Sequence, residues 1–281
     1  MSIRLVFDST IGLNEAEKKA YDIEITPFII NDKDEHFHDY IDIDPIEFCD
    51  RYKKNVHIKT SQPNIHETSE LFKKLLEKYD EIIYCPLPSA LSGTYASGVM
   101  IAKEIDPERI KVVDLNTGLG MARLLAKKGN EMIKQGKTSA EIISYFEKAK
   151  DNQRLFFIPE TLDGLKRGGR VSNMAAGVFT MIKLKISIYL TKTGNFDKFE
   201  VCRTMPKMIK SIIKDVKEKL GDKNLIVYAI YSNNQDLLFE PLSLITKEFK
   251  DIEVESMPLS PTITAHTAPE TVGFHFCRKS W

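Results

Sequence analysis

The chain lacks the features that mark several large classes of protein. Its 281 residues include 40 Lys and Arg against 40 Asp and Glu, so the formal net charge is +0. Proteins that bind nucleic acid usually carry a basic excess, because contacts with phosphate supply much of their affinity. The balance therefore argues against nucleic acid as the main partner. It also argues against a protein held to membranes by charge, although transient membrane contact stays open.

Long apolar segments are missing as well. No stretch approaches the ~20 apolar residues that span a bilayer, and the longest runs, such as 225–231, have the length of a strand. Asp8 interrupts the first apolar run too early for a signal peptide. We therefore expect no transmembrane segment and a cytoplasmic location. The cysteines are few, far apart and form no C-x-x-C pair, which predicts reduced, buried thiols and neither a disulfide scaffold nor a structural zinc site; they are Cys49, Cys85, Cys202 and Cys277.

Two nucleotide-binding motifs are absent, namely G-x-x-x-x-G-K-[ST] and G-x-G-x-x-G. We expect no nucleotide bound by those routes and no cofactor. The pair His36 and His38 lies in a polar, acidic segment, 31–44. Metal binding needs organised neutral imidazoles, and a loop supplies no framework for them. The sequence therefore predicts no metal site.

The order of apolar and amphipathic segments predicts an α/β protein. Short apolar runs alternate with helical patterns through the first half, which is typical of a mostly parallel sheet with helices on both faces. Helix starts are marked clearly: Asn64 and Glu67 have capping-box spacing, and so do Thr138 and Glu141. A single apolar strand is expected at 23–30.

The second half has a different texture. Two β-rich runs, 185–191 and 196–202, flank a Lys-Thr-Gly-Asn turn, which is a hairpin signal. A hairpin within an α/β pattern indicates a mixed sheet. We predict two domains: an N-terminal parallel α/β/α sandwich over 1–152, and a C-terminal mixed-sheet α/β domain with a β-hairpin over 153–281.

Four polar spots follow predicted strands, where open α/β sheets bind their ligands. Hydroxyls and free N–H groups at a helix start favour an anion. Each spot alone could simply be a helix cap or a loop brace, but two hydroxyl clusters in one domain could converge on one anion. The four are Asp8-Ser9-Thr10, Thr60-Ser61-Gln62-Pro63, Ser89 to Thr94, and Asp114.

Other residues leave further functions open. Ser92 could be a nucleophile with His266 as its base, giving an acyl-transfer or hydrolytic enzyme, although the G-x-S-x-G elbow is missing. Gly168-Gly169-Arg170 follows Lys166 and Arg167, and suits a flexible anion loop or a docking surface. With the helix starts, that loop could bind a small phosphorylated metabolite.

Taken together, these motifs resemble the DegV family of bacterial fatty-acid-binding proteins, from residue 3 to about residue 278. The resemblance rests on the order and spacing of several pieces. They are Asp8-Ser9-Thr10, Thr60 to Pro63, Ser92-Gly93-Thr94-Tyr95, Asp114, Leu165 to Arg170, Lys183, Lys185, Gly194, Arg203 and the region around His266.

The resemblance implies that a long-chain fatty acid, palmitate- or oleate-like, lies between the two domains. It implies that hydroxyls and a histidine hold the carboxyl group, and carried over these are Thr60, Ser61, Ser92, Thr94 and His266. It further implies a carrier with no catalytic residue of its own. A separate fatty acid kinase, related to dihydroxyacetone kinases, would phosphorylate the bound acid, and Arg170 and Arg203 would face that partner.

The acyl chain would supply most of the affinity in such a carrier. Each buried CH₂ is worth about 0.8 kcal/mol, so ~15 methylenes offer on the order of 12 kcal/mol before the costs of association. Candidate tunnel residues, for which a core role is an equal alternative, are Phe28, Met174, Phe179 and Met181. One departure from the family pattern follows the histidine, where Ala268 and Glu270 replace two usual glycines.

Overall fold

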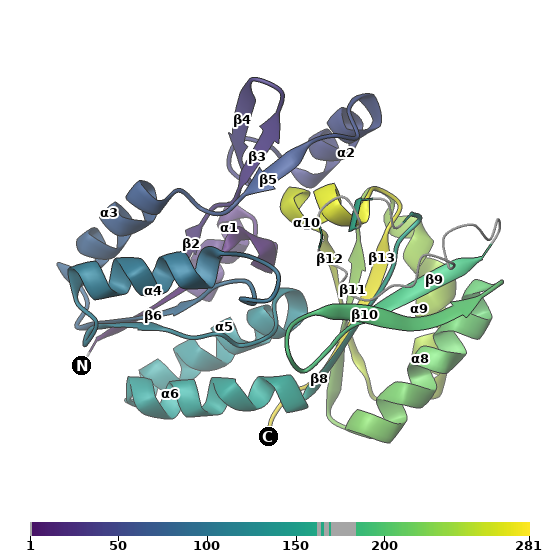
Figure 1. The fold of residues 1–281 in the computed structure, drawn as a ribbon. Helices are drawn as coiled ribbons and strands as arrows, with labels where there is room; N and C mark the ends of the chain where they lie inside the picture. Colours follow the sequence, from purple (N-terminus) through teal and green to yellow (C-terminus); the bar gives the residue numbers. More distant parts are fainter. Residues whose placement is uncertain (1, 162–163, 166–168, 170–183) are drawn as a thin grey trace. The chain divides into compact units, whose positions relative to one another are not determined.

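The computed structural model describes residues 2–161, 164–165, 169 and 184–281 (Figure 1). The chain forms two compact units. The first contains residues 1–44 and 58–151, and the second contains residues 45–57 and 152–281. The segment 45–57 thus packs with the second unit although it lies early in the chain.

The first unit is built on a four-stranded parallel sheet, as the sequence predicted. Every residue of β6 is buried, and so are five of the six residues of β1, which is the burial expected for parallel strands covered on both faces. The strand order is β2-β1-β6-β7. The strands are β1 (Ile3–Asp8), β2 (Glu24–Thr26), β6 (Glu81–Cys85) and β7 (Ile110–Val112).

Helices cover both faces of this sheet, which confirms the sandwich (Figure 1). Phe72, Tyr84 and Ile101 form part of the core beneath α3 and α4. On the other face α5 approaches closely at Gly129, where a Cβ would lie 2.7 Å from atoms of both Leu5 and Phe146. The helices of this unit are α1 (Glu15–Tyr21), α3 (Ile65–Leu76), α4 (Thr94–Ile105), α5 (Leu119–Lys134), α6 (Ser139–Phe146) and the 3₁₀ turns η1 (Ser9–Ile11) and η2 (Glu147–Asp151).

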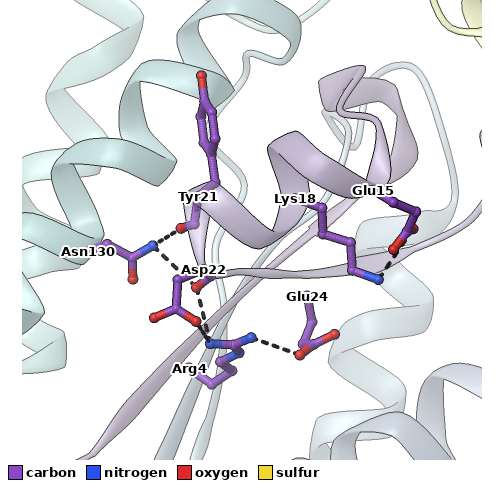
Figure 2. Close-up of polar contacts among 7 residues, drawn as sticks. All are labelled: Arg4, Glu15, Lys18, Tyr21, Asp22, Glu24 and Asn130. Atoms are coloured by element: carbon purple, nitrogen blue, oxygen red, sulfur yellow. Dashed lines mark hydrogen bonds and ion pairs between the residues drawn. The ribbon is translucent and has the colours of Figure 1, made fainter.

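Polar contacts fix the connection between α1 and β2 at one edge of the sheet (Figure 2). The Arg4 guanidinium on β1 donates to the side chain of Asp22, and at 2.8 Å to Glu24 Oε1. The Asn130 amide on α5 donates to the carbonyl oxygens of Tyr21 and Asp22. These bonds tie β1, whose far end carries Asp8, to the strand beside it and to the connection before that strand, which α5 also holds.

A small three-stranded sheet, which the sequence did not predict, completes the first unit. The prediction of a loop over 31–44 was wrong, since a hairpin occupies its first half. Its turn contains Lys33 at φ 57°, so the usual glycine signal is missing. The predicted strand 23–30 is broken at Pro27. The sheet has the order β4-β3-β5, from β3 (Ile29–Asp32), β4 (Glu35–His38) and β5 (Lys59–Ser61).

The second unit contains a six-stranded mixed sheet, again as predicted. β11 pairs with β12 in parallel and with β13 in antiparallel fashion. The predicted hairpin is β9 and β10, and Gly194 in its turn has φ 80°. The order is β10-β9-β8-β13-β11-β12. The strands are β8 (Gln153–Ile158), β9 (Lys185–Leu190), β10 (Phe196–Cys202), β11 (Leu225–Tyr231), β12 (Glu253–Pro258) and β13 (Val272–Arg278).

The helices α8 and α9 pack on one face of this mixed sheet, and α2 and α10 contact each other. α8 buries Ile209, Ile212 and Val216 in the main core cluster. α2 contacts α10, and the Cys49 thiol on α2 points at the carbonyl oxygen of Ser232. The helices are α2 (Pro45–Lys54), α8 (Met205–Leu220), η4 (Gln235–Leu238), α9 (Phe239–Glu248) and α10 (Pro261–Thr267). Among the described residues, no helix is long and apolar enough to cross a membrane.

Candidate functional site

Asp8 braces the end of β1 against the loop that follows β6. Its carboxylate accepts hydrogen bonds from the Thr10 backbone N–H at 3.0 Å, from the Thr10 hydroxyl and from the backbone N–H of Leu87. Because the side chain is buried, the pKa of Asp8 rises to about 6. Asp8 therefore shapes this edge of the sheet, which is the alternative role that the sequence left open for it.

Asp114 braces the same loop from the other side. Its two carboxylate oxygens each accept a backbone N–H at 3.2 Å, one from Ser89 and one from Asn116. The loop after β6 is thus held at Leu87 by the carboxylate at the end of β1, and at Ser89 by the carboxylate that follows β7. The loop leading to Ser92 has a defined shape at the carboxyl edge of the parallel sheet, where α/β proteins bind ligands.

Ser92 and Thr94 lie at the start of α4 and contact each other. Their hydroxyl oxygens are 2.7 Å apart, and the Thr94 backbone N–H points at the Ser92 oxygen at 3.3 Å. Ser92 is half-buried, whereas Thr94 is only 3% exposed. The N-cap, Gly93, supplies no side-chain cap. A half-exposed hydroxyl beside the N–H groups of a helix start is suited to an anion.

Gln62 connects the two hydroxyl-bearing segments of the first unit. Its amide nitrogen donates to the Ser97 hydroxyl on α4 at 2.7 Å. Its amide oxygen lies 2.9 Å from where a Cβ on Gly93 would be. The segment Thr60 to Pro63 therefore contacts the first turn of α4, and a side chain at position 93 would press on that contact.

Thr60 and Ser61 occupy neighbouring positions on β5 and so face opposite sides of the small sheet. Thr60 pairs with the buried Ile30 and is itself half-buried. Ser61 is exposed, and its hydroxyl oxygen accepts from the Asn31 amide at 3.0 Å. Sequence reasoning missed this division, because the short strand β5 was not predicted.

Asn64 caps α3 as predicted, accepting the backbone N–H groups of His66 and Glu67. The Glu67 carboxylate does not return to the cap. It lies 3.2 Å from His38 Nε2, and His38 Nδ1 contacts Asp42 at 2.8 Å. Within the described residues, no group of three or more His, Cys, Asp or Glu side chains could hold a metal ion.

His266 lies on α10 in the second unit and is half-buried. The neighbouring segment approaches its backbone very closely. A Cβ on Gly164 would lie 2.3 Å from the His266 carbonyl oxygen, which is well inside van der Waals contact. Only glycine fits at position 164 with the present backbone.

In the turn after His266, two residues that are not glycine adopt the positive φ values typical of glycine. Ala268 has φ 68° and ψ 159°, and Glu270 has φ 65°. The first is a region that residues other than glycine seldom occupy, at a cost of about 1–3 kcal/mol. Hydrogen bonds hold the turn: the Thr271 hydroxyl donates to the Ala268 carbonyl at 2.8 Å, and the Asn233 amide donates to the Glu270 carboxylate.

A small cavity lies at the carboxyl edge of the parallel sheet, lined in part by Asp8, Cys85 and Leu115. It has room for about one water molecule, so it cannot hold an acyl chain. Burial raises the pKa of the Cys85 thiol, which keeps it protonated and unreactive. All four cysteines are buried and free.

The remaining predicted residues divide into described and undescribed positions. Arg203 is exposed, between β10 and α8. Phe28 is buried, and its N–H donates to the Ser9 hydroxyl at 3.0 Å, which fits a role in the core. Several predicted positions lie outside the described residues: Lys166, Arg167, Gly168, Arg170, Met174, Phe179, Met181 and Lys183.

Relatives of this chain are named for fatty acid binding. A "Fatty acid-binding protein" from Thermotoga maritima is 28% identical, covering 98% of this chain and 97% of its own. The solved structure of DegV, described as a fatty acid binding protein from Bacillus subtilis, is 25% identical with a TM-score of 0.87, covering 99% of each chain. A DegV family protein from Thermus thermophilus, described under fatty acid binding, has the same fold (24% identical, TM-score 0.90, covering 99% of this chain and 100% of that one).

The family model described as "Uncharacterised protein, DegV family" matches residues 2–279. That match spans both units, including the braced loops of the first and the turn after His266 in the second. The expected two-domain α/β fold is thus confirmed, and the chain belongs to the DegV family.

Proposed function

We propose that this protein binds a long-chain fatty acid and holds its carboxyl group with hydroxyls. The observation that carries the proposal is the contact between the two hydroxyl-bearing segments of the first unit, made by Gln62 with Ser97 at the start of α4. Relatives named for fatty acid binding support it. Direct contact with the carboxyl is assigned to Thr60, Ser92 and His266.

The two other candidate hydroxyls have supporting roles in this proposal. Ser61 faces the side of β5 opposite to Thr60 and is bonded to Asn31. Thr94 is buried beneath Ser92. Neutral donors suit the task, since a carboxylate held by hydroxyls needs no buried Lys or Arg with its desolvation cost. The acyl chain supplies the affinity and requires no net field, in keeping with the net charge of +0.

Ligand analysis and uptake test this function. The purified protein, denatured and extracted, should release a fatty acid by mass spectrometry, or the delipidated protein should take up palmitate or oleate. A hydrogen bond to a charged group is worth about 1.5–3 kcal/mol, so Ser92→Ala should weaken oleate binding roughly 10- to 100-fold. Ser69→Ala, at a half-buried serine on α3, should leave it unchanged. Absence of both endogenous lipid and uptake would refute the proposal.

The proposal extends to a carrier that presents its ligand to a separate fatty acid kinase in the cytoplasm, with Arg170 and Arg203 on the docking side. Exposure of Arg203 supports this. With ATP and a dihydroxyacetone-kinase-like fatty acid kinase, Arg203→Ala should slow acyl-phosphate formation while oleate binding persists. Ester turnover that disappears in Ser92→Ala would instead support an acyl-transfer enzyme.

A further inference from the structure

We propose that Thr94 is a positioning residue that aims the Ser92 hydroxyl at the carboxylate. This inference rests on the proposed function and divides the labour within the segment Ser92 to Thr94. Thr94 is 3% exposed and Ser92 is half-buried. Ser92 is therefore the more accessible of the two to a ligand at the surface of this loop, whereas Thr94 is almost fully shielded.

The hydrogen bonds of the pair limit where each proton can go. A serine hydroxyl has one proton and two lone pairs. One lone pair of Ser92 accepts the backbone N–H of Thr94 at 3.3 Å. Across the 2.7 Å contact between the hydroxyls, either oxygen could be the donor. Among the described residues, this contact with Ser92 is the one hydrogen bond of the Thr94 hydroxyl.

A carboxylate selects between the two arrangements. If Ser92 donates to Thr94, its proton is used and nothing remains for the ligand. If Thr94 donates to Ser92, both lone pairs of Ser92 are occupied and its proton must point outward. A carboxylate only accepts hydrogen bonds, so it binds the second arrangement. The resulting chain, from Thr94 through Ser92 to the ligand, also strengthens each bond by polarisation.

A double-mutant cycle measures this coupling. Oleate would be titrated into the delipidated full-length protein as wild type, Thr94→Val, Ser92→Ala and the double variant. Thr94→Val leaves the Ser92 hydroxyl free to rotate and without its polarising donor, so it should weaken binding about 3- to 10-fold when Ser92 is present. In the Ser92→Ala background it should have no effect, because the hydroxyl that it aims is gone. Thr94→Ser keeps the donor and should bind like wild type.

A second ligand provides a readout that a merely structural role would not move. Oleyl alcohol can donate as well as accept, so it fits either arrangement of the pair, and Thr94→Val should change its affinity less than about 2-fold. Thermal unfolding of each variant shows whether it is folded, and Thr94→Ala would replace a valine variant that is not.

The outcomes are distinct. An equal loss from Thr94→Val with and without Ser92, or an equal loss for the acid and the alcohol, would overturn the positioning role, and so would no loss at all. If the wild-type protein binds no oleate, the proposed function itself fails and this inference fails with it.

Discussion

The candidate ligand segments of the two units differ in how their backbone conformation is stabilised. In the first unit, Asp8 and Asp114 accept backbone N–H groups of the loop before Ser92. No residue from Pro86 to Thr94 has a positive φ. In the second unit, the turn after His266 places Ala268 and Glu270 at positive φ. The difference shows that hydrogen bonds can impose a glycine-like turn on residues with a Cβ, at a cost in backbone strain.

The largest expected effect compares a glycine of each unit. The Cβ of Gly164→Ala would collide with the backbone carbonyl of His266, and backbone cannot turn aside. We expect a loss of about 3 kcal/mol or more in the free energy of unfolding. The Cβ of Gly93→Ala would meet only the end of the flexible Gln62 side chain, so its loss should stay below about 1 kcal/mol.

Chemical denaturation of both variants measures this pair. Gly93→Ala should still weaken oleate binding, because the contact of Gln62 with α4 is displaced. Equal losses of stability for the two variants would contradict the expectation that a Cβ against backbone at position 164 costs more than a Cβ against a flexible side chain at position 93.

Acid should act in opposite directions through two buried groups, Asp8 in the first unit and His275 in the second. Burial raises the pKa of Asp8 to about 6, so as the pH falls the folded state takes up this proton before the unfolded state does. The contribution of Asp8 to the free energy of unfolding therefore rises as the pH falls from 7 to 4. Burial lowers the pKa of His275 to about 3. There the unfolded state takes up the proton first, and stability is lost between pH 6.5 and 3. Between pH 7 and pH 5, protonation linked to His275 should lower the free energy of unfolding by roughly 2 kcal/mol. Protonation of Asp8 should raise it by roughly 1 kcal/mol.

Denaturation at pH 7 and pH 5 separates the two groups. The acid loss should shrink in His275→Gln and grow in Asp8→Asn. His275 is bonded to Gln153 within the sheet of the second unit at 2.7 Å, so each variant is also compared with wild type at pH 7. Variants that both follow the wild-type pH dependence would contradict this assignment.

The smallest effect tests the strain directly. Ala268→Gly should raise the free energy of unfolding by about 1 kcal/mol, since relief of about 1–3 kcal/mol is partly offset by the greater chain entropy of glycine. Glu270→Gly should gain less, because it also loses the bond to Asn233. In contrast, Ala265→Gly inside α10 should lose about 1 kcal/mol. A loss at position 268 as large as that at 265 would mean that the turn is not strained.

Local rules predicted much of the fold. The capping box of Thr138 and Glu141 and the β9–β10 hairpin are present because their partners are close in sequence. The β3–β4 hairpin escaped prediction, since its turn places Lys33 in a conformation typical of glycine or asparagine. The strand β5 has three residues, too few for a periodic pattern, and β13 and α10 were also missed.

The candidate site was less accessible from sequence for a related reason. Polar residues after strands marked the loops of the candidate site, and the bracing role of Asp8 and Asp114 was anticipated as an alternative. Which hydroxyl faces a ligand depends on burial and pleat. The opposite faces of Thr60 and Ser61, and the burial of Thr94 behind Ser92, follow from tertiary packing.

A crystal structure of the delipidated protein supplied with oleate tests the central claim most directly. We predict elongated electron density whose carboxyl end lies within hydrogen-bond distance of the Ser92 hydroxyl, close to Thr60. Density with the carboxyl far from Ser92, or a protein that remains empty with oleate in excess, would contradict the account.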